Sequence, residues 1–249
     1  VQTERKRLRR VEALEELREA LNLESLPLRI ECYDISNIQG SDVVGSMVVF
    51  QDALAKKAHY RKFGVKTLDG QDDYAALEEV VSRRFARLEQ GATAEEYDES
   101  FAAMPNLVVI DGGKGQLAAA LQAMQAYDLP RVAVISLAKR EEEVFVPGQP
   151  DPIRLDRDSP GLHLLQRIRD EAHRFALGFH RQRRDARARE SIFDTLQGVG
   201  PARRRALLRH FGSAERFLAA SQEELEGVPG IPERTARSIY AQLHKAGRA

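Results

Sequence analysis

The sequence has no apolar run that approaches about 18 residues, the length a membrane helix needs, and its only cysteine is Cys32. A membrane span is therefore excluded, and one cysteine cannot form an internal disulfide. No secretory signal stands at the start, so a reducing, cytoplasmic location fits these absences. The chain also begins without an initiator Met, and we expect it to be part of a longer protein.

A nucleotide-binding phosphate loop is missing as well. Gly112-Gly-Lys-Gly115 follows an apolar run but lacks the G-x-x-x-x-G-K-[ST] spacing, and Gln116 stands where a metal-binding Ser or Thr should be. We therefore expect no nucleotide cofactor. The glycines would instead let a substrate backbone approach Asp111, and Lys114 is a candidate phosphate contact.

The net charge is zero, but the charges are unevenly distributed. Residues 1–180 carry 24 Lys and Arg against 30 Asp and Glu, a net of −6, whereas residues 181–249 carry 14 against 8, a net of +6. A basic tail on an acidic body predicts that the tail meets a polyanion and the body holds cations. Such splits also arise by chance in highly charged chains.

Hydrophobic periodicity predicts an α/β body after a charged helical segment over residues 1–24. Short connections between the first three strands predict an antiparallel meander. The expected elements are strands over 28–35, 43–51 and 58–66, a helix over 72–89, a strand over 106–111, a helix over 116–127, a strand over 131–137, a small hairpin of 144–146 with 153–155, and a helix from Pro160 to about residue 182. This order is that of a ribonuclease H-like mixed sheet with flanking helices, although other α/β folds begin similarly.

Two similar helical units follow an Arg-rich segment, residues 183–190, which we expect to be a linker. Each unit has a hairpin with glycine: Gly198-Val-Gly200 in the first and Gly230-Ile-Pro232 in the second. Glycine permits positive φ and a close backbone approach, and free N–H groups at a helix start attract phosphate. The pair resembles the tandem helix-hairpin-helix motif, which holds both backbones across a minor groove. The alternative is a small helical protein-interaction module.

The first hairpin is expected to bind phosphate more strongly than the second. Pro232 has no N–H to donate, whereas Arg203, Arg204 and Arg205 add positive charge beside the first hairpin.

Two aspartates stand at strand-like runs and a histidine lies on a predicted helix. In a ribonuclease H-like sheet the strands of Asp34 and Asp111 are neighbours, so both carboxylates would reach one divalent ion that activates a water. His173 would ligate the ion or transfer a proton. Taken singly, each has a plainer interpretation, as a turn or cap aspartate or as an exposed helix histidine.

Three further residues have two interpretations each. Tyr60 and Arg61 mix an aromatic ring and a cation on a predicted strand, which suits DNA backbone contact; an ordinary half-exposed strand is the alternative. Asp73 is a candidate helix cap, in competition with Asp72.

Four motifs and the paired hairpins together resemble the C-terminal half of UvrC, the dual-incision subunit of the bacterial excinuclease. The motifs are Tyr33-Asp-Ile-Ser-Asn-Ile-Gln-Gly40, Asp72-Asp-Tyr-Ala-Ala76, Ile110-Asp-Gly-Gly-Lys-Gly-Gln-Leu117 and Arg169-Asp-Glu-Ala-His-Arg-Phe175. The resemblance implies a ribonuclease H-like endonuclease domain over 25–186 and a tandem helix-hairpin-helix domain over 187–249.

The same resemblance implies an activity and its machinery. The module would incise double-stranded or bubble DNA 5′ of a lesion after the subunit UvrB has prepared the site. Asp34, Asp111 and His173 would form the catalytic triad, Asp73 would be a further acidic residue needed for the cut, and Mg²⁺ or Mn²⁺ would be the cofactor. The family's 3′-cutting nuclease domain has no counterpart in the chain, nor does the UvrB-binding segment, unless residues 1–24 are its remnant.

Two other classes of function stay open. One is a non-catalytic DNA-binding scaffold with a degenerate ribonuclease H-like fold. The other is a transposase or resolvase-type relative, which the Asp-Asp-His set and the hairpin tail disfavour.

Overall fold

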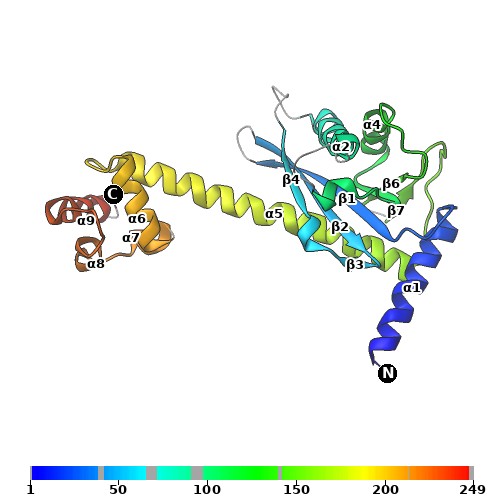
Figure 1. The fold of residues 1–249 in the computed structure, drawn as a ribbon, viewed down its shortest axis with the longest axis horizontal. Coiled ribbons are helices and arrows are strands. Elements are labelled where there is room, and N and C mark those ends of the chain that lie inside the picture. The colour runs from blue at the N-terminus through cyan, green and yellow to red at the C-terminus, as the bar shows by residue number, and fades with distance from the viewer. Residues whose placement is uncertain are drawn as a thin grey trace. The chain divides into compact units, whose positions relative to one another are not determined.

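The chain divides into two compact units, Val1–Gly178 and Phe179–Ala249. The first unit is α/β and the second is helical (Figure 1). No helix in the part of the chain that the structure describes is both long and apolar enough to cross a membrane. The computed structural model describes residues 2–38, 42–65, 72–90, 98–139, 142–212 and 214–246.

A mixed sheet forms the centre of the first unit, in the order β3-β2-β1-β5-β6-β7 with β4 paired to β2. β1 and β2 are antiparallel, β1, β5 and β6 run parallel, and β7 returns antiparallel to β6. The strands are β1 (Arg29–Ile38), β2 (Asp42–Gln51), β3 (Leu54–Ala55), β4 (Arg61–Gly64), β5 (Leu107–Asp111), β6 (Ala133–Ala138) and β7 (Glu143–Phe145). The meander and the parallel strands confirm the predicted fold class.

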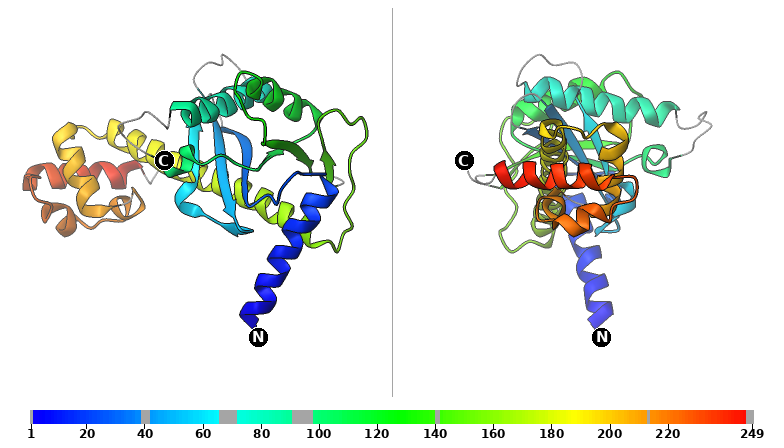
Figure 2. Two further views of the ribbon diagram at one scale, coloured as in Figure 1. Left: turned by 45° about the vertical axis from the view of Figure 1, so that its right-hand side comes forward. Right: turned by 90° about the vertical axis from the view of Figure 1, so that its left-hand side faces the viewer.

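Helices cover both faces of this sheet (Figure 2). α1 (Gln2–Ala20) and α5 (Pro160–Thr195) pack on the face that carries Cys32, Val109 and Leu137. α2 (Asp73–Gln90), α3 (Glu99–Ala102) and α4 (Lys114–Met124) pack on the face that carries the intervening residues, such as Val108 and Ile110. Because side chains alternate along a strand, every second residue of β1 and of β5 faces α5, as Cys32 and Val109 do.

The segment expected to be a linker, residues 183–190, is helical, because α5 continues through it to Thr195. The segment has no Gly or Pro and is rich in Arg and Ala, which have high helix propensity. The missing apolar periodicity therefore did not mark the end of the helix. The domain boundary expected at 186–187 lies inside this helix.

Three other elements differ from the prediction in their limits. The strand expected from residue 58 starts at Arg61, because Lys57–His59 form a short 3-10 turn. α4 starts at Lys114 rather than Gln116, since the Gln116 side chain accepts a hydrogen bond from the Gly113 backbone N–H at 3.1 Å and closes the first turn. The hairpin expected around residues 147–150 is reduced to a single antiparallel bridge between Val144 and Ile153.

The second unit continues from the end of α5 with four short helices around a small core. Leu207, Phe217, Leu225 and Ile239 are buried at its centre. The helices are α6 (Pro201–Phe211), α7 (Ala214–Leu218), α8 (Gln222–Glu226) and α9 (Glu233–Ala246).

Candidate metal centre and helix-hairpin-helix unit

Two neighbouring parallel strands bring Asp34 and Asp111 together. Tyr33 on β1 pairs with Ile110 on β5, so the next residue on each strand lies at the same level of the sheet. Parallel strands in register point these two side chains to the same face, the face that α5 covers. The buried β5 run ends at Asp111, which places its carboxylate at the carboxyl edge of the sheet.

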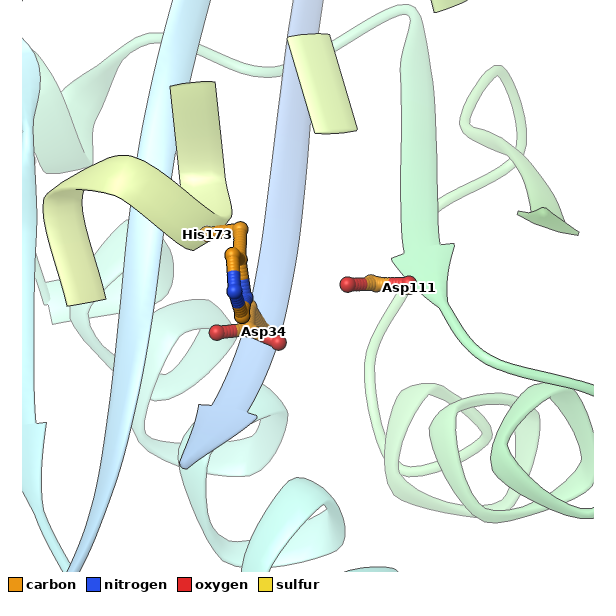
Figure 3. Close-up of side chains that lie close together, drawn as sticks. All are labelled: Asp34, Asp111 and His173. Carbon is orange, nitrogen blue, oxygen red and sulfur yellow. The ribbon is translucent and has the colours of Figure 1, made fainter. Parts of the chain in front are cut away.

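His173 completes the cluster from α5 (Figure 3). One ligand atom from each of Asp34, Asp111 and His173 lies within 4.8 Å of the others. Asp34 is buried and His173 is exposed, so the cluster has a closed floor and an open side. The structure therefore brings together the three residues that the sequence singled out.

The surroundings of Asp34 act on its pKa in both directions. Burial raises the pKa of Asp34 above its ordinary value, and the nearby Asp111 raises it further. A hydrogen bond from Ser36 Oγ to Asp34 Oδ2, at 2.8 Å, and the charges of His173 and Lys139 act in the opposite direction. The thiol of Cys32, just below, has its pKa raised by burial and by both aspartates, so it is an inert neighbour.

The donor set fits a hard divalent cation. In the described residues, Asp111 Oδ2 is buried and accepts no hydrogen bond. Lys139 Nζ lies 3.2 Å from that oxygen as an ion pair, without the alignment of a hydrogen bond. A buried anionic oxygen that lacks donors is costly unless a cation meets it, and carboxylate oxygens are what Mg²⁺ and Mn²⁺ prefer.

Asp73, which the sequence singled out, lies at the start of α2. Asp73 is the first residue of α2 and is not part of the three-residue cluster. Asp72, not Asp73, caps this helix: its Oδ1 accepts hydrogen bonds from the backbone N–H groups of Tyr74 and Ala75 at 3.0 and 3.1 Å. The capping interpretation of Asp73 is therefore wrong, and its proposed role in the cut stays a prediction.

The structure places Tyr60 and Arg61 in packing contacts. Tyr60 is 8% exposed, stacks edge-on against Phe175, and donates a hydrogen bond to Glu171 at 3.0 Å. Arg61 forms a two-pronged pair with Asp98, with its closest N–O distances at 2.8 Å. These contacts favour the plainer interpretation, a half-exposed strand, over DNA contact.

The segment after Asp111 is packed against the protein itself. The ammonium group of Lys114 donates to the carbonyl of Pro150 and lies 5.3 Å from the centroid of the Phe145 ring. A Cβ on Gly112 would stand 2.8 Å from Gln116, so this glycine makes room for the helix start. The contact of Lys114 with a phosphate stays a prediction.

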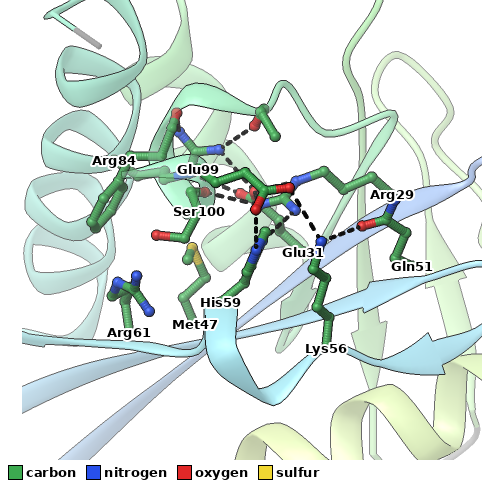
Figure 4. Close-up of polar contacts among 12 residues, drawn as sticks. Arg29, Glu31, Met47, Gln51, Lys56, His59, Arg61, Arg84, Glu99 and Ser100 are labelled. Atoms are coloured by element: carbon green, nitrogen blue, oxygen red, sulfur yellow. Dashed lines mark hydrogen bonds and ion pairs between the residues drawn. The ribbon is translucent and has the colours of Figure 1, made fainter. Parts of the chain in front are cut away.

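Glu31, three residues before Asp34 on β1, belongs to a different cluster on the opposite face (Figure 4). Its carboxylate is fully buried between Arg84, at 2.8 Å, and Arg29, at 2.9 Å, and it also accepts from the Tyr33 hydroxyl. Arg84 in turn donates to the carbonyls of Phe101 and Ala103. This network ties β1 to α2 and α3 and leaves Glu31 no role at the metal centre.

Both glycine hairpins of the second unit have the backbone that the sequence predicted. Gly198 and Gly230 each adopt a φ of +85°. Gly200 precedes α6 with Pro201 at its first turn, and Arg203 donates to the Gly198 carbonyl at 2.7 Å, which braces the first hairpin. Arg204 and Arg205 lie on the same helix beside it.

Sequence reasoning missed the cations around the triad. Lys139 directly follows β6, and Asp111, the last residue of β5, pairs with Leu137 two residues before it, so the two side chains meet. Arg169, one turn before His173, is paired with Glu142 at 2.7 Å. The signal available in the sequence was a lysine directly after an apolar strand.

These features define a class of protein in which a ribonuclease H-like domain with a carboxylate-histidine cluster is joined to a tandem helix-hairpin-helix unit. The model of the UvrC RNAse H endonuclease domain matches residues 18–177, and that of the SAM-like Helix-hairpin-helix tandem matches residues 190–245. The chain belongs to the UvrC family.

Named relatives agree with this placement. UvrABC system protein C of Thermobifida fusca (strain YX) is 51% identical over 251 residues, which cover 94% of this chain and 38% of that protein. UvrABC system protein C of Dehalococcoides mccartyi (strain CBDB1) is 51% identical over 232 residues, covering 93% of this chain and 38% of that protein. The chain thus spans about two fifths of the length of these relatives.

One solved structure is similar only in part. Endonuclease V of Ciona intestinalis, in complex with inosine-containing DNA, aligns over 68% of each chain at 12% identity with a TM-score of 0.33. That likeness is too weak to carry an argument.

Proposed function

We propose that this chain is the metal-dependent DNA endonuclease module of bacterial nucleotide excision repair, that it acts in the cytoplasm and that it incises DNA 5′ of a lesion. The observation that carries the proposal is the convergence of Asp34, Asp111 and His173 within 4.8 Å. Membership of the UvrC family and the matched endonuclease domain supply the reaction class. A degenerate scaffold would have no reason to keep a buried carboxylate pair at this cost.

The carboxylates of Asp34 and Asp111 would hold a Mg²⁺ or Mn²⁺ ion. Such an ion supplies charge stabilisation at the phosphoryl oxygens and lowers the pKa of a bound water. The buried floor around Asp34 fixes the carboxylate on a rigid strand, which keeps the reacting geometry tight. His173, on the open side, would ligate the ion or take up a proton.

The second unit would hold the DNA for this site. The Gly198 and Gly230 hairpins offer backbone N–H groups to phosphates without reading bases, and Arg203, Arg204 and Arg205 add charge beside the first. In the same proposal, UvrB presents the lesion-containing DNA, and Asp73 supports the cut from the start of α2.

The test is incision of a lesion-bearing duplex that is already nicked on the 3′ side and loaded with UvrB. The chain should cut 5′ of the lesion when Mg²⁺ or Mn²⁺ is added and not when it is removed by chelation. Asp111→Asn should lower the rate by at least about 100-fold while DNA affinity stays within about twofold. A variant that still cuts at the original rate would rule out the metal centre as the catalyst.

A further inference from the structure

Lys139 forms an ion pair with the candidate metal centre. Its ammonium group lies 3.2 Å from Asp111 Oδ2, and its charge also acts on Asp34. The side chain is 60% exposed, whereas the Asp111 side chain is 2% exposed. A long, solvated side chain thus reaches a buried carboxylate from the open side of the site.

Glu142, which follows Lys139 closely in the sequence, is paired with the helix that carries His173. Glu142, three residues further on, pairs with Arg169 at 2.7 Å, and Arg169 is only 12% exposed at its side chain. Glu142 has a φ of +54°, an uncommon conformation for a residue with a side chain. This pair places Glu142 beside the turn of α5 that precedes His173, while the exposed side chain of Lys139 reaches Asp111.

The charge balance of the site indicates a role for Lys139 in binding the substrate phosphate. With both carboxylates ionised, Asp34 and Asp111 contribute two negative charges and Lys139 one positive charge. A divalent cation then leaves the loaded site at +1, which matches the single negative charge of one DNA phosphate. Without Lys139 the loaded site would be neutral before the substrate arrived, and the phosphate would bind less strongly.

We propose that Lys139 is a substrate-contacting residue that changes partner. It neutralises Asp111 before the ion is bound, and it contacts a non-bridging oxygen of the cut-site phosphate once the ion occupies the carboxylates. This proposal rests on the proposed function. The competing role is a structural one, in which Lys139 only holds Asp111 in place.

Binding of Mn²⁺ without DNA separates the two roles, measured as free Mn²⁺ by electron paramagnetic resonance. Lys139→Met keeps the length of the side chain and removes the charge. It should tighten Mn²⁺ binding by about threefold or more, because a cation that repels the ion is gone. Unchanged or weaker binding would overturn the exchange of partners. Lys56→Met is the matched control, since Lys56 forms an exposed pair with Glu99 at 3.3 Å away from the triad; it should bind Mn²⁺ like the unmodified chain.

Single-turnover incision of the UvrB-loaded duplex gives the second measurement. Lys139→Met should cut about 100-fold more slowly, Lys139→Arg should recover part of the rate, and Lys56→Met should match the unmodified chain. If Asp111→Asn is inactive while Lys139→Met cuts at full rate, the Lys139 proposal is wrong and the proposed function stands. If the unmodified chain is as inactive as Asp111→Asn, the proposed function fails, and the Lys139 proposal fails with it.

Discussion

The carboxyl group of Asp34, within β1, is buried beside that of Asp111 at the end of β5. It is 6% exposed, and burial raises its pKa above the ordinary value of 3.8. An acid whose pKa is higher in the folded chain ionises first in the unfolded chain. Ionised Asp34 therefore destabilises the metal-free fold as pH rises from its ordinary pKa through its folded pKa.

Asp34→Asn should consequently stabilise the metal-free protein at neutral pH. We expect a melting temperature higher by a few degrees in the presence of a chelator, with the gain shrinking as the pH falls toward 3.8. Thermal unfolding followed by circular dichroism across that pH range measures it. The exposed Asp128→Asn is the control and should show no such trend. A gain that is equally large at acid pH would refute the electrostatic cause.

Site residues could be predicted where their sequence neighbours identify them. They were missed where contacts with distant segments give them their role. Asp111 could be predicted because an apolar strand runs directly into it. Lys139 could not, because its meaning depends on the pairing of β6 with β5. The packing of Tyr60 could not be predicted, because Glu171 and Phe175, which contact it, come from α5.

At the scale of elements, the Arg84–Glu31 pair fastens α2 to the middle of the sheet. Both side chains are fully buried, and the charges satisfy one another and nearby carbonyls. Removing one partner of a buried pair leaves the other charge uncompensated, which is far more costly than losing the attraction alone.

Arg84→Met should therefore destabilise the first unit by about 3–5 kcal/mol, measured by urea unfolding. The adjacent Arg83→Met is the control: Arg83 forms a partly exposed pair with Glu79 at 3.1 Å, and its loss should cost about 1 kcal/mol or less. Replacing Glu31 with Gln in the Arg84→Met background should recover part of the loss. Equal effects of the two arginines would show that the buried network does not stabilise the fold.

The two hairpins of the second unit offer a matched comparison. Gly198 and Gly230 share a φ of +85°, and a Cβ added at either position would meet nothing within 4 Å. Alanine at either site should thus cost a similar amount of folding free energy, about 1–2 kcal/mol.

DNA affinity should separate these two variants. Gly198→Ala should weaken binding to a duplex more than Gly230→Ala does, because Pro232 leaves the second hairpin one N–H donor short. Fluorescence anisotropy with labelled duplex at fixed salt compares them. Equal losses, or a larger loss for Gly230→Ala, would contradict the ranking of the hairpins.

Element type was predictable where apolar residues recur, and element limits were not. α5 shows the reason: residues 183–190 lack an apolar stripe but are mostly Arg, Ala and Glu, which are strong helix formers, so propensity carries the helix on to Thr195. The prediction of a hairpin around residues 147–150 overlooked a long-range pairing. β7 pairs with β6 over Glu143–Phe145, whereas Val144 forms only one bridge to Ile153 in the returning segment.

At the scale of the whole molecule, the charge separation along the chain follows the division into units. The acidic part contains the carboxylate cluster and the basic part contains the glycine hairpins, as the sequence indicated. The order of elements predicted the sheet, because short connections permit only an antiparallel meander and helical crossovers only parallel strands. The closeness of Asp34, Asp111 and His173 followed from that topology once α5 lay across the same face.

The central claim is that these three residues form one metal centre, and a metal-soaked crystal tests it most directly. An anomalous difference map from crystals soaked in Mn²⁺ should show a peak between the carboxylates of Asp34 and Asp111, within reach of the His173 ring. Crystals of Asp111→Asn soaked in the same way should lack it. A Mn²⁺ peak elsewhere, with none at the cluster, would contradict the account.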